Sequence, residues 1–318
     1  MRVFITGGAG RLGTRVCKAF HQNGFDVRLF DIRTPITLKR VKDLDNQIQV
    51  VWGDITDIDA LREAMDEIDA VVHMAVVMSP LIHERPDLGK KVNVEGTKNI
   101  VDLIKEKGSG IPFVYTSSVA VFGPKSNMSD PVISEQDEPK PKGIYAETKY
   151  QGEIEIKKSG IDYVILRLAS GWHLTLEKSD IAYMFNTPLN APIEVFHPDD
   201  CIRAILDSIR RFDDVKGNTM IISSGPKCRI RHRDRVEAFL KILGLPMPPA
   251  DRFSTGQVNI SWYDTAMSQE LLDYQKCTFK DYIENYSNEL KRRYTRFFIP
   301  MMRYFIGPVF GPFIVKHI

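Results

Sequence analysis

The stretch that decides the fold is Val-Phe-Ile-Thr-Gly-Gly-Ala-Gly-Arg-Leu-Gly, residues 3–13. Its apolar start predicts a strand, and a glycine-rich loop follows at once. Glycine lets the backbone turn tightly and lets a pyrophosphate approach the amide groups, and the N-terminus of the helix expected over residues 13–23 favours the anion. A strand, a glycine loop and a helix in this order predict a dinucleotide-binding loop formed by Gly7, Gly10, Arg11, Leu12 and Gly13.

An acidic residue follows the next expected strand, residues 27–30. Asp31 comes 18 residues after Gly13. A carboxylate at this position accepts hydrogen bonds from the ribose hydroxyls of the adenosine half and repels a 2′-phosphate. The alternative interpretation is a plain turn aspartate. Because Arg33 and Arg11 are able to pair with a 2′-phosphate, the sequence favours NAD and leaves NADP open.

Short apolar runs alternate with helical patterns through the first half of the chain. This alternation predicts an α/β fold, a Rossmann-type doubly wound parallel sheet. Beyond residue 170 the alternation fades, which predicts a smaller C-terminal α/β lobe for the substrate. Strands are expected over residues 3–5, 27–30, 48–52, 70–73, 112–116, 163–168 and 219–223, and helices over 13–23, 58–65, 93–107, 145–158, 198–211 and 233–243.

The expected organisation has three parts. Residues 1–170 form the dinucleotide-binding Rossmann domain. Residues 171–290 form the substrate-binding lobe, with some chain returning to the Rossmann core. Residues 291–318 form a basic and aromatic tail.

Composition excludes several classes of protein. The 318 residues are 43% hydrophobic and 26% charged, which excludes a disordered chain. With 43 Lys and Arg against 41 Asp and Glu, the net charge is +2, so we expect no nucleic-acid partner. The four cysteines lie far apart without CxxC spacing, so neither a metal site nor a disulfide framework is expected. Cysteine usage and the absence of a secretory signal at the start favour a reducing, cytoplasmic location.

A second group of residues suggests acid–base chemistry. In Tyr145-Ala-Glu-Thr-Lys149 the phenol and the ammonium lie four residues apart, on one face of a helix. An ammonium near a tyrosine favours its phenolate. Ser118 stands at the carboxyl end of the fifth strand, the edge where open α/β sheets bind ligands. Taken alone, the Tyr–Lys spacing could arise by chance and Ser118 could be a turn hydroxyl.

Taken together, these motifs resemble those of the extended short-chain dehydrogenase/reductases, the group of NAD-dependent epimerases and dehydratases that includes UDP-galactose 4-epimerase. The resemblance covers roughly residues 1–285. It rests on landmarks in the family's order and spacing: TGGAGRLG at 6–13, Gly53-Asp54-Ile55, His73-Met74-Ala75, Asn93-Val-Glu-Gly-Thr97, YTSSVAVFG at 115–123, Tyr145-xxx-Lys149, Leu166-Arg167, His197-Pro-Asp-Asp200 and Leu272-Asp-Tyr-Gln275.

The resemblance implies a role for each matched residue. Tyr145 would be the catalytic acid/base, Lys149 would lower its pKa and hold the nicotinamide ribose, and Ser118 would bind the reacting oxygen. It also implies a homodimer formed through the helix of Tyr145 and its neighbour. The remaining implied cofactor contacts are Asp54 and Ile55 at the adenine, Ala75 along the ribose path, Asn93 beside the lysine and Ala169 at the carboxamide.

The implied function is an NAD(P)-dependent epimerase or dehydrogenase/reductase that transfers hydride at an alcohol or ketone carbon. The substrate would be a sugar, a sugar nucleotide or another small carbonyl compound. Val119 and Ala120 stand where the family's dehydratases carry acidic residues, which disfavours water elimination. Only 29 residues separate Arg167 from His197, fewer than sugar-nucleotide members usually have. A non-catalytic NAD(P)-sensing protein is the alternative.

The tail differs from the rest of the chain. Basic residues cluster over 291–296, and residues 297–315 then carry one charge, Arg303. Three prolines and two glycines in this run disfavour a regular transmembrane helix. Two interpretations stay open: the tail packs on the protein itself or on a partner subunit, which we favour, or it makes a peripheral contact with an anionic membrane surface.

Overall fold

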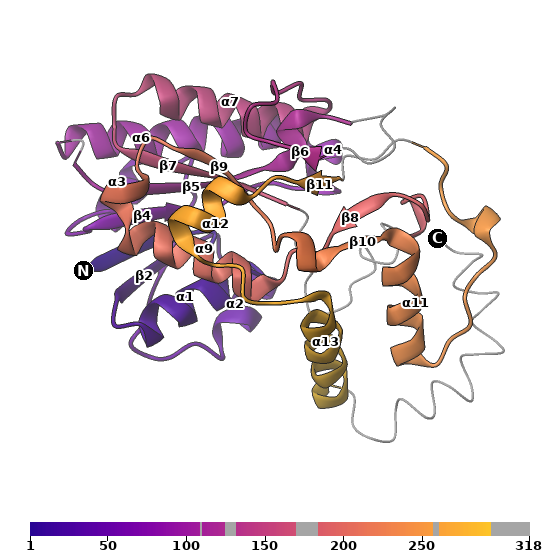
Figure 1. Ribbon diagram of the computed structural model, residues 1–318. Coiled ribbons are helices and arrows are strands. Elements are labelled where there is room, and N and C mark those ends of the chain that lie inside the picture. Colours follow the sequence, from indigo (N-terminus) through magenta and orange to yellow (C-terminus); the bar gives the residue numbers. More distant parts are fainter. Residues whose placement is uncertain (109, 125–131, 170–183, 257–260, 294–318) are drawn as a thin grey trace.

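The computed structural model describes residues 1–108, 110–124, 132–169, 184–256 and 261–293. Its centre is a seven-stranded parallel sheet in the order β3-β2-β1-β4-β5-β7-β9 (Figure 1). The doubly wound parallel sheet predicted from the alternation is thereby confirmed. The strands are β1 (Arg2–Thr6), β2 (Asp26–Asp31), β3 (Gln49–Trp52), β4 (Ala70–His73), β5 (Phe113–Ser118), β7 (Tyr163–Leu168) and β9 (Thr219–Ile222).

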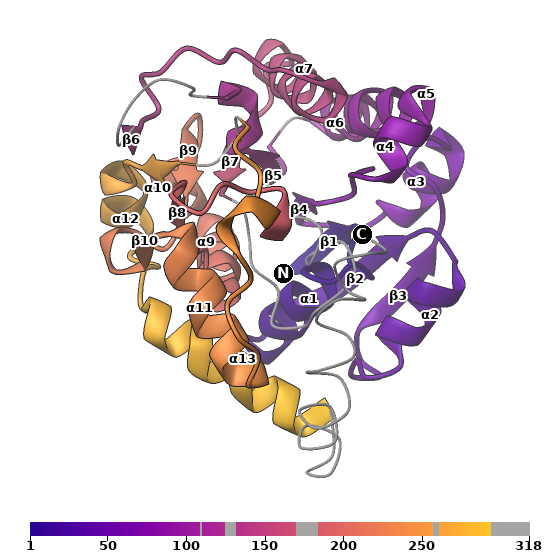
Figure 2. The ribbon, with the colours of Figure 1, turned by 90° about the vertical axis from the view of Figure 1, so that its right-hand side faces the viewer.

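Alternate side chains of strands β1, β2, β3, β4, β5 and β7 enter two separate cores, one on each face of the sheet. On β1, Val3 and Ile5 enter the first core, while Phe4 enters the second. This alternation follows from the two-residue period of a strand. The first core is closed by α1 (Gly13–Gln22), α9 (Pro198–Arg210) and α12 (Ala266–Leu272), and the second by α3 (Ile58–Ala64), α6 (Thr97–Glu106) and α7 (Ile144–Lys158). Figure 2 shows these layers from the end of the sheet.

The helix expected over residues 93–107 begins differently from the prediction. Residues Lys91–Gly96 form a π-helical turn, η1, which continues into α6. Apolar spacing could not reveal this wider turn, because the side-chain bonds of Asn93 that accompany it are tertiary. Helices not expected from the sequence are α2 (Pro35–Val41), α4 (Leu81–Glu84), α5 (Pro86–Lys90), α10 (Phe212–Val215), α12 (Ala266–Leu272) and α13 (Phe279–Arg293).

A smaller lobe lies at the carboxyl ends of the strands (Figure 1). It holds an antiparallel pair, β8 (Pro192–Glu194) with β10 (Arg229–Arg231), and a parallel pair, β6 (Val132–Ile133) with β11 (Trp262–Tyr263). Helices α11 (His232–Leu243) and α13 (Phe279–Arg293) pack beside these strands. The short turns are η2 (Val119–Phe122), η3 (Pro226–Cys228) and η4 (Ala250–Arg252).

The chain passes between sheet and lobe more than once. Helices α9 and α12 and strand β9 come after residue 170 and lie on the main sheet, whereas β6 comes before it and pairs with β11 of the lobe. Helix α13 extends to Arg293, into the segment expected as a tail. The expectations for residues 297–315 lie outside the described residues. Among the described helices, none is long and apolar enough to cross a bilayer.

Candidate active site

The glycine loop between β1 and α1 leaves no room for side chains. Gly7 has a φ of +68°, and a Cβ on it would lie 2.7 Å from the backbone nitrogen of Ala75. A Cβ on Gly13 would collide with the carbonyl oxygen of Gly7, and the amide of Gly10 donates to that same oxygen at 3.0 Å. The loop therefore presents bare backbone at a helix N-terminus, which suits a pyrophosphate.

Asp31 holds this loop from the end of β2. Its Oδ2 accepts a hydrogen bond from the amide of Ala9 at 2.9 Å, and its Oδ1 accepts one from Ile32 at 2.8 Å. Burial raises the pKa of Asp31, and these two hydrogen bonds oppose that shift. The carboxylate thus lies beside the loop, where the adenosine ribose would bind.

The other residues expected near the adenine surround this end of the sheet. Arg11 and Leu12 are half-buried at the start of α1, and Arg33 is exposed after β2. Asp54 is exposed, and its Oδ1 accepts from the amide of Thr56 at 2.9 Å. Ile55 is buried. Asp54 therefore fixes a turn and, together with Asp31 and Ile55, follows strands β2 and β3 at one edge of the sheet.

A buried hydrogen-bond chain links the glycine loop to the π-helical turn. The amides of Met74 and Ala75 donate to Thr6 Oγ1, which lies 2.6 Å from His73 Nδ1. On the other side, His73 Nε2 lies 2.9 Å from Thr97 Oγ1, whose hydroxyl donates to the carbonyl of Asn93. Burial, and then Lys149, hold the pKa of His73 well below its usual value, so the ring is neutral.

Asn93 joins the segment after β4 to the helix of Tyr145. Its Oδ1 accepts from the amide of Val77 at 2.7 Å, and its Nδ2 donates to the carbonyl of Val77 at 3.1 Å. The same Nδ2 donates to Thr148 Oγ1 at 3.0 Å, and Thr148 donates to the carbonyl of Tyr145 at 3.0 Å. Asn93 thus fixes the distance between the segment that follows β4, which includes Val77, and the first turn of α7.

Tyr145 lies next to Ser118 at the carboxyl end of β5, and Lys149 is one helical turn further along α7, with its ammonium over the ring of Tyr115 on β5. The hydroxyls of Tyr145 and Ser118 form a hydrogen bond. Burial raises the pKa of Tyr145, and this bond opposes the shift. Burial also lowers the pKa of Lys149 to about 7, against the opposing charge of Glu153. The tyrosine is therefore in its acid form at neutral pH.

A buried ion pair fixes α7 against the sheet. Glu153 accepts hydrogen bonds from Arg167 Nε at 3.0 Å and Nη2 at 2.7 Å, and from Ser117 Oγ at 2.6 Å. All three residues are buried, and the guanidinium of Arg167 also lies 4.8 Å from the ring of Phe122. One carboxylate therefore joins α7 to β5 and β7, one residue away from Ser118.

The two expected alanine contacts lie at neighbouring strand ends. Ala75 is half-buried after β4, and its amide faces Thr6 Oγ1 at 3.3 Å. Ala169 is buried after β7, and its amide donates to the carbonyl of Ile222 on β9 at 2.9 Å. The structure thus brings the proposed cofactor residues to the carboxyl ends of strands β1, β2, β3, β4, β5 and β7.

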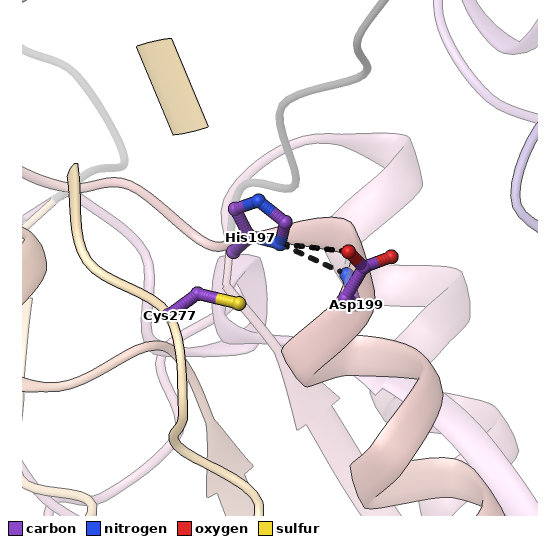
Figure 3. A group of neighbouring side chains, drawn as sticks. All are labelled: His197, Asp199 and Cys277. Atoms are coloured by element: carbon purple, nitrogen blue, oxygen red, sulfur yellow. Dashed lines mark hydrogen bonds and ion pairs between the residues drawn. The ribbon is translucent and has the colours of Figure 1, made fainter. Parts of the chain in front are cut away.

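A second cluster of polar side chains lies at the start of α9, away from Tyr145 in the sequence. Figure 3 shows His197, Asp199 and Cys277, whose ligand atoms lie within 4.8 Å of one another. His197 Nδ1 accepts from the amide of Asp199 at 3.1 Å, Arg15 pairs with Asp199 at 2.6 Å, and Arg203 Nη2 lies 3.1 Å from Cys277 Sγ. Each group has a protein partner and two are next to arginines, which does not suit a cation.

The fold and the glycine loop together define a Rossmann-type enzyme that depends on a dinucleotide. A model described as the NAD dependent epimerase/dehydratase family matches residues 3–171. The chain belongs to this family of NAD-dependent enzymes. The bare glycine backbone and the carboxylate of Asp31 fit that cofactor.

Named relatives agree with this assignment. The chain is 26% identical to the D-erythronate dehydrogenase of Cupriavidus necator over 77% of this chain and 82% of that protein. It is 25% identical to the D-erythronate dehydrogenase of Haemophilus influenzae, over 86% and 81%. Its fold is similar to that of a UDP-glucose 4-epimerase from Thermotoga maritima, with a TM-score of 0.79 and 18% identity over 92% and 99% of the two chains.

The motifs did not reveal every polar residue of this region. Thr6, Thr148 and Tyr115 had no expected role, and neither did the partners of Glu153. One signal was present in the alternation along β5. Tyr115 and Ser117 are two residues apart, so both point to the face that α7 covers. Which helix covers that face is a tertiary property, so their partners could not be named from the sequence.

Proposed function

We propose that the protein is an NAD-dependent dehydrogenase that oxidises a secondary alcohol of a small hydroxylated substrate through Ser118, Tyr145 and Lys149. The observation that carries the proposal is positional: Tyr145 at the start of α7 lies next to Ser118 at the carboxyl end of β5, and the ammonium of Lys149, one helical turn further along α7, lies 4.1 Å from the ring of Tyr115 on β5. Two neighbouring hydroxyls suit proton transfer to or from a substrate oxygen.

The substrate class is inferred from the relatives. Two D-erythronate dehydrogenases match more than three quarters of both chains, which supports a sugar acid or a similarly small polyhydroxylated compound. The segment after β4, Val76-Val77-Met78, is apolar, so one wall of the site would face the less polar side of the substrate. Sugar nucleotides are the competing substrates, and the test below separates them.

The proposed roles follow from position. NAD, when bound, supplies the hydride acceptor. Ser118 would hold the substrate hydroxyl through its Oγ. Tyr145 would first release its own phenolic proton to solvent, and its phenolate Oη would then receive the hydroxyl proton as the carbon gives up its hydride to NAD. Lys149 would favour the phenolate that this transfer requires, because a nearby cation stabilises an anion. Asn93 would hold the segment after β4 in a fixed position relative to Tyr145, because it bonds to both Val77 and Thr148.

The cofactor is proposed to bind along the strand ends. The amides of the glycine loop would hold the pyrophosphate, and Asp31 would accept from the adenosine ribose. That role favours NAD over NADP, although Arg33 and Arg11 are close in sequence to the ribose position. The remaining proposed contacts are Gly7, Gly10, Leu12, Gly13, Asp54, Ile55, Ala75, Asn93, Tyr145, Lys149 and Ala169.

The test is a redox panel with purified protein. Sugar acids including D-erythronate, free sugars, UDP-sugars and 3β-hydroxysteroids are each incubated with NAD, and NADH is followed by its absorbance. Stoichiometric NADH with a sugar acid supports the proposal. A converted UDP-sugar without net NADH would instead identify an epimerase. Tight NAD binding with no turnover of any compound would instead support the alternative interpretation, a non-catalytic protein that senses NAD.

The assembly and location are proposals as well. We infer a homodimer through the outer faces of α6 and α7 and a cytoplasmic enzyme, both on the strength of the resemblance. These faces carry exposed charges, among them Lys98 and Glu147, and Lys98 pairs with Asp102 at 3.0 Å. Light scattering in low and high salt tests the dimer, since a contact between such faces is screened by salt.

A further inference from the structure

An aromatic ring lies under the ammonium of Lys149. Nζ of Lys149 is 4.1 Å from the centroid of the Tyr115 ring on β5. Both side chains are buried, with Lys149 2% and Tyr115 1% exposed. A cation within about 6 Å of the face of a tyrosine is attracted by the ring quadrupole, and the attraction is larger where water is excluded.

The ring of Tyr115 is held from both sides. Against α7, a Cβ on Gly152 would lie 2.6 Å from Tyr115 Oη, so only glycine leaves room for this hydroxyl. A glycine inside a helix is less favourable than an alanine, and the close approach of the Tyr115 hydroxyl is a reason for glycine at this position. Against β4, the Tyr115 and His73 ring centroids are 5.4 Å apart, and His73 is fixed by Thr6 and Thr97.

We propose that Tyr115 is a positioning residue whose ring holds the ammonium of Lys149 in place and in its charged form beside Tyr145. The link to turnover rests on the function proposed above. The contact itself does not, because it exists without substrate. Lys149 needs such support, since its burial disfavours the charge and lowers its pKa to about 7.

Few other groups act on this ammonium. On α7, Glu153 favours the charge and Tyr145 is in its neutral form; on β4, His73 is neutral. Arg167 on β7 is paired with Glu153. In the described parts of the other elements packed on α7, the charged residues are exposed or half-buried on the outer surface: Glu84, Arg85, Asp87, Lys90, Lys91, Glu95, Lys98, Asp102, Lys105 and Glu106. The ring is therefore the second favourable partner, after Glu153.

The experiment measures the titration of Lys149 directly. The protein is labelled with ¹³Cε-lysine, and the resonance lost in Lys149→Arg assigns the signal in the NAD complex and in the free protein. Four variants are compared with the wild type. Tyr115→Phe keeps the aromatic ring, and Tyr115→Leu removes it. Replacing Tyr115 by 3,4,5-trifluorophenylalanine keeps the size of the ring but weakens its quadrupole, and Phe113→Leu removes a buried ring that does not face Lys149. Phe113 is a matched control, because it is on the same strand and also stacks on His73, at 6.3 Å.

We expect Tyr115→Leu to lower the Lys149 pKa by about half to one and a half pH units, and the fluorinated ring to lower it in the same direction. Tyr115→Phe and Phe113→Leu should leave it unchanged. The alkaline limb of kcat/KM for alcohol oxidation should move to lower pH by the same amount, because turnover needs the ammonium.

The inference is overturned if the fluorinated variant titrates like Tyr115→Phe, or if Phe113→Leu shifts Lys149 as much as Tyr115→Leu does. The fluorinated variant decides the question even if Tyr115→Leu does not fold. A wild type that oxidises no alcohol would refute the proposed function alone, since the titration is measured without turnover.

Discussion

The sheet and the lobe each bury a carboxylate that pairs with an arginine, but the two carboxylates have different partners. Glu153, between α7 and the sheet, accepts from side chains: Arg167 and Ser117. Glu194, at the end of β8, accepts from Arg229 Nε at 3.0 Å and from the amides of Gly225 at 2.8 Å and Tyr263 at 3.2 Å. The first holds the helix of Tyr145 in place, and the second holds loops.

The same difference extends to neighbouring groups. In the sheet, the buried polar residues Thr6, His73 and Asn93 form connections that end at Tyr145. Where α9 meets the lobe, Asp200 pairs with Arg203 and accepts from Ser224 Oγ at 2.7 Å and from the amides of Lys276 and Cys277. Buried polarity therefore orders side chains for chemistry in one region and fixes backbone in the other. Removing a group should reduce activity in the first case and stability in the second.

The largest effect is expected at the tyrosine itself. Tyr145→Phe removes the hydroxyl that would accept the substrate proton, so kcat should fall by about 10²–10⁴-fold. The Kd for NAD should stay within a few-fold of wild type, because the glycine loop and Asp31 are untouched. Steady-state kinetics and calorimetric NAD titration measure the two quantities. Wild-type turnover by Tyr145→Phe would refute the proposed role.

The two buried carboxylates provide a matched pair of variants. Glu153→Gln and Glu194→Gln each leave an arginine without its charge partner, so each should lower the free energy of unfolding by about 3–5 kcal/mol. Only Glu153→Gln should also reduce kcat of the folded protein, because Glu153 binds Ser117 and raises the pKa of Lys149. Urea unfolding and kinetics below the unfolding transition measure both effects. An equal loss of kcat in Glu194→Gln would contradict the distinction between sheet and lobe.

A smaller effect is expected from acid on the lobe. His232 is buried at the start of α11, its Nε2 bonds to the carbonyl of Met184 at 2.8 Å, and burial lowers its pKa to about 4. The unfolded chain binds this proton near pH 6.5, whereas the folded chain binds it only near pH 4, so stability is lost as pH falls through that window. We expect the loss to reach about 3 kcal/mol.

His232→Gln tests this linkage. Glutamine still has a donor for the carbonyl of Met184 but does not titrate, so the slope of unfolding free energy between pH 6.5 and 4 should become smaller by about one bound proton. Equal slopes in wild type and His232→Gln would show that this histidine does not control acid stability.

Sequence patterns predicted the sheet well because its signals are local. Continuous apolar runs identified all seven strands of the main sheet within two residues, and the glycine loop identified the start of α1. Strand β9 was expected as a strand, but its place beside β7 depends on a tertiary contact that periodicity does not carry. The two-residue strands β6 and β11 are shorter than any pattern that a period of two could reveal.

For the site, motif spacing brought forward Ser118, Tyr145 and Lys149, which the structure places together. It did not predict the state of these groups. The helical spacing favoured a tyrosine phenolate, but the pKa depends on burial, which raises it for Tyr145 and lowers it for Lys149. Similarly, the roles of Tyr115 and Gly152 could not be predicted from either residue alone, because the missing side chain of Gly152 makes room for the Tyr115 side chain only in the folded structure.

The smallest effect on the site is expected from removing the tail. Residues 297–318 follow α13, whose Tyr282, Tyr286 and Leu290 are buried in the lobe, while Lys291 and Arg292 are exposed at its end. Deleting 297–318 should therefore leave the Kd for NAD unchanged, but it should alter solubility, assembly or lipid binding, because a long apolar segment needs a surface to cover it. Co-sedimentation with anionic vesicles separates the two interpretations. No binding by the full chain would exclude the lipid contact, whereas binding that disappears on deletion would exclude packing of the tail on the protein alone.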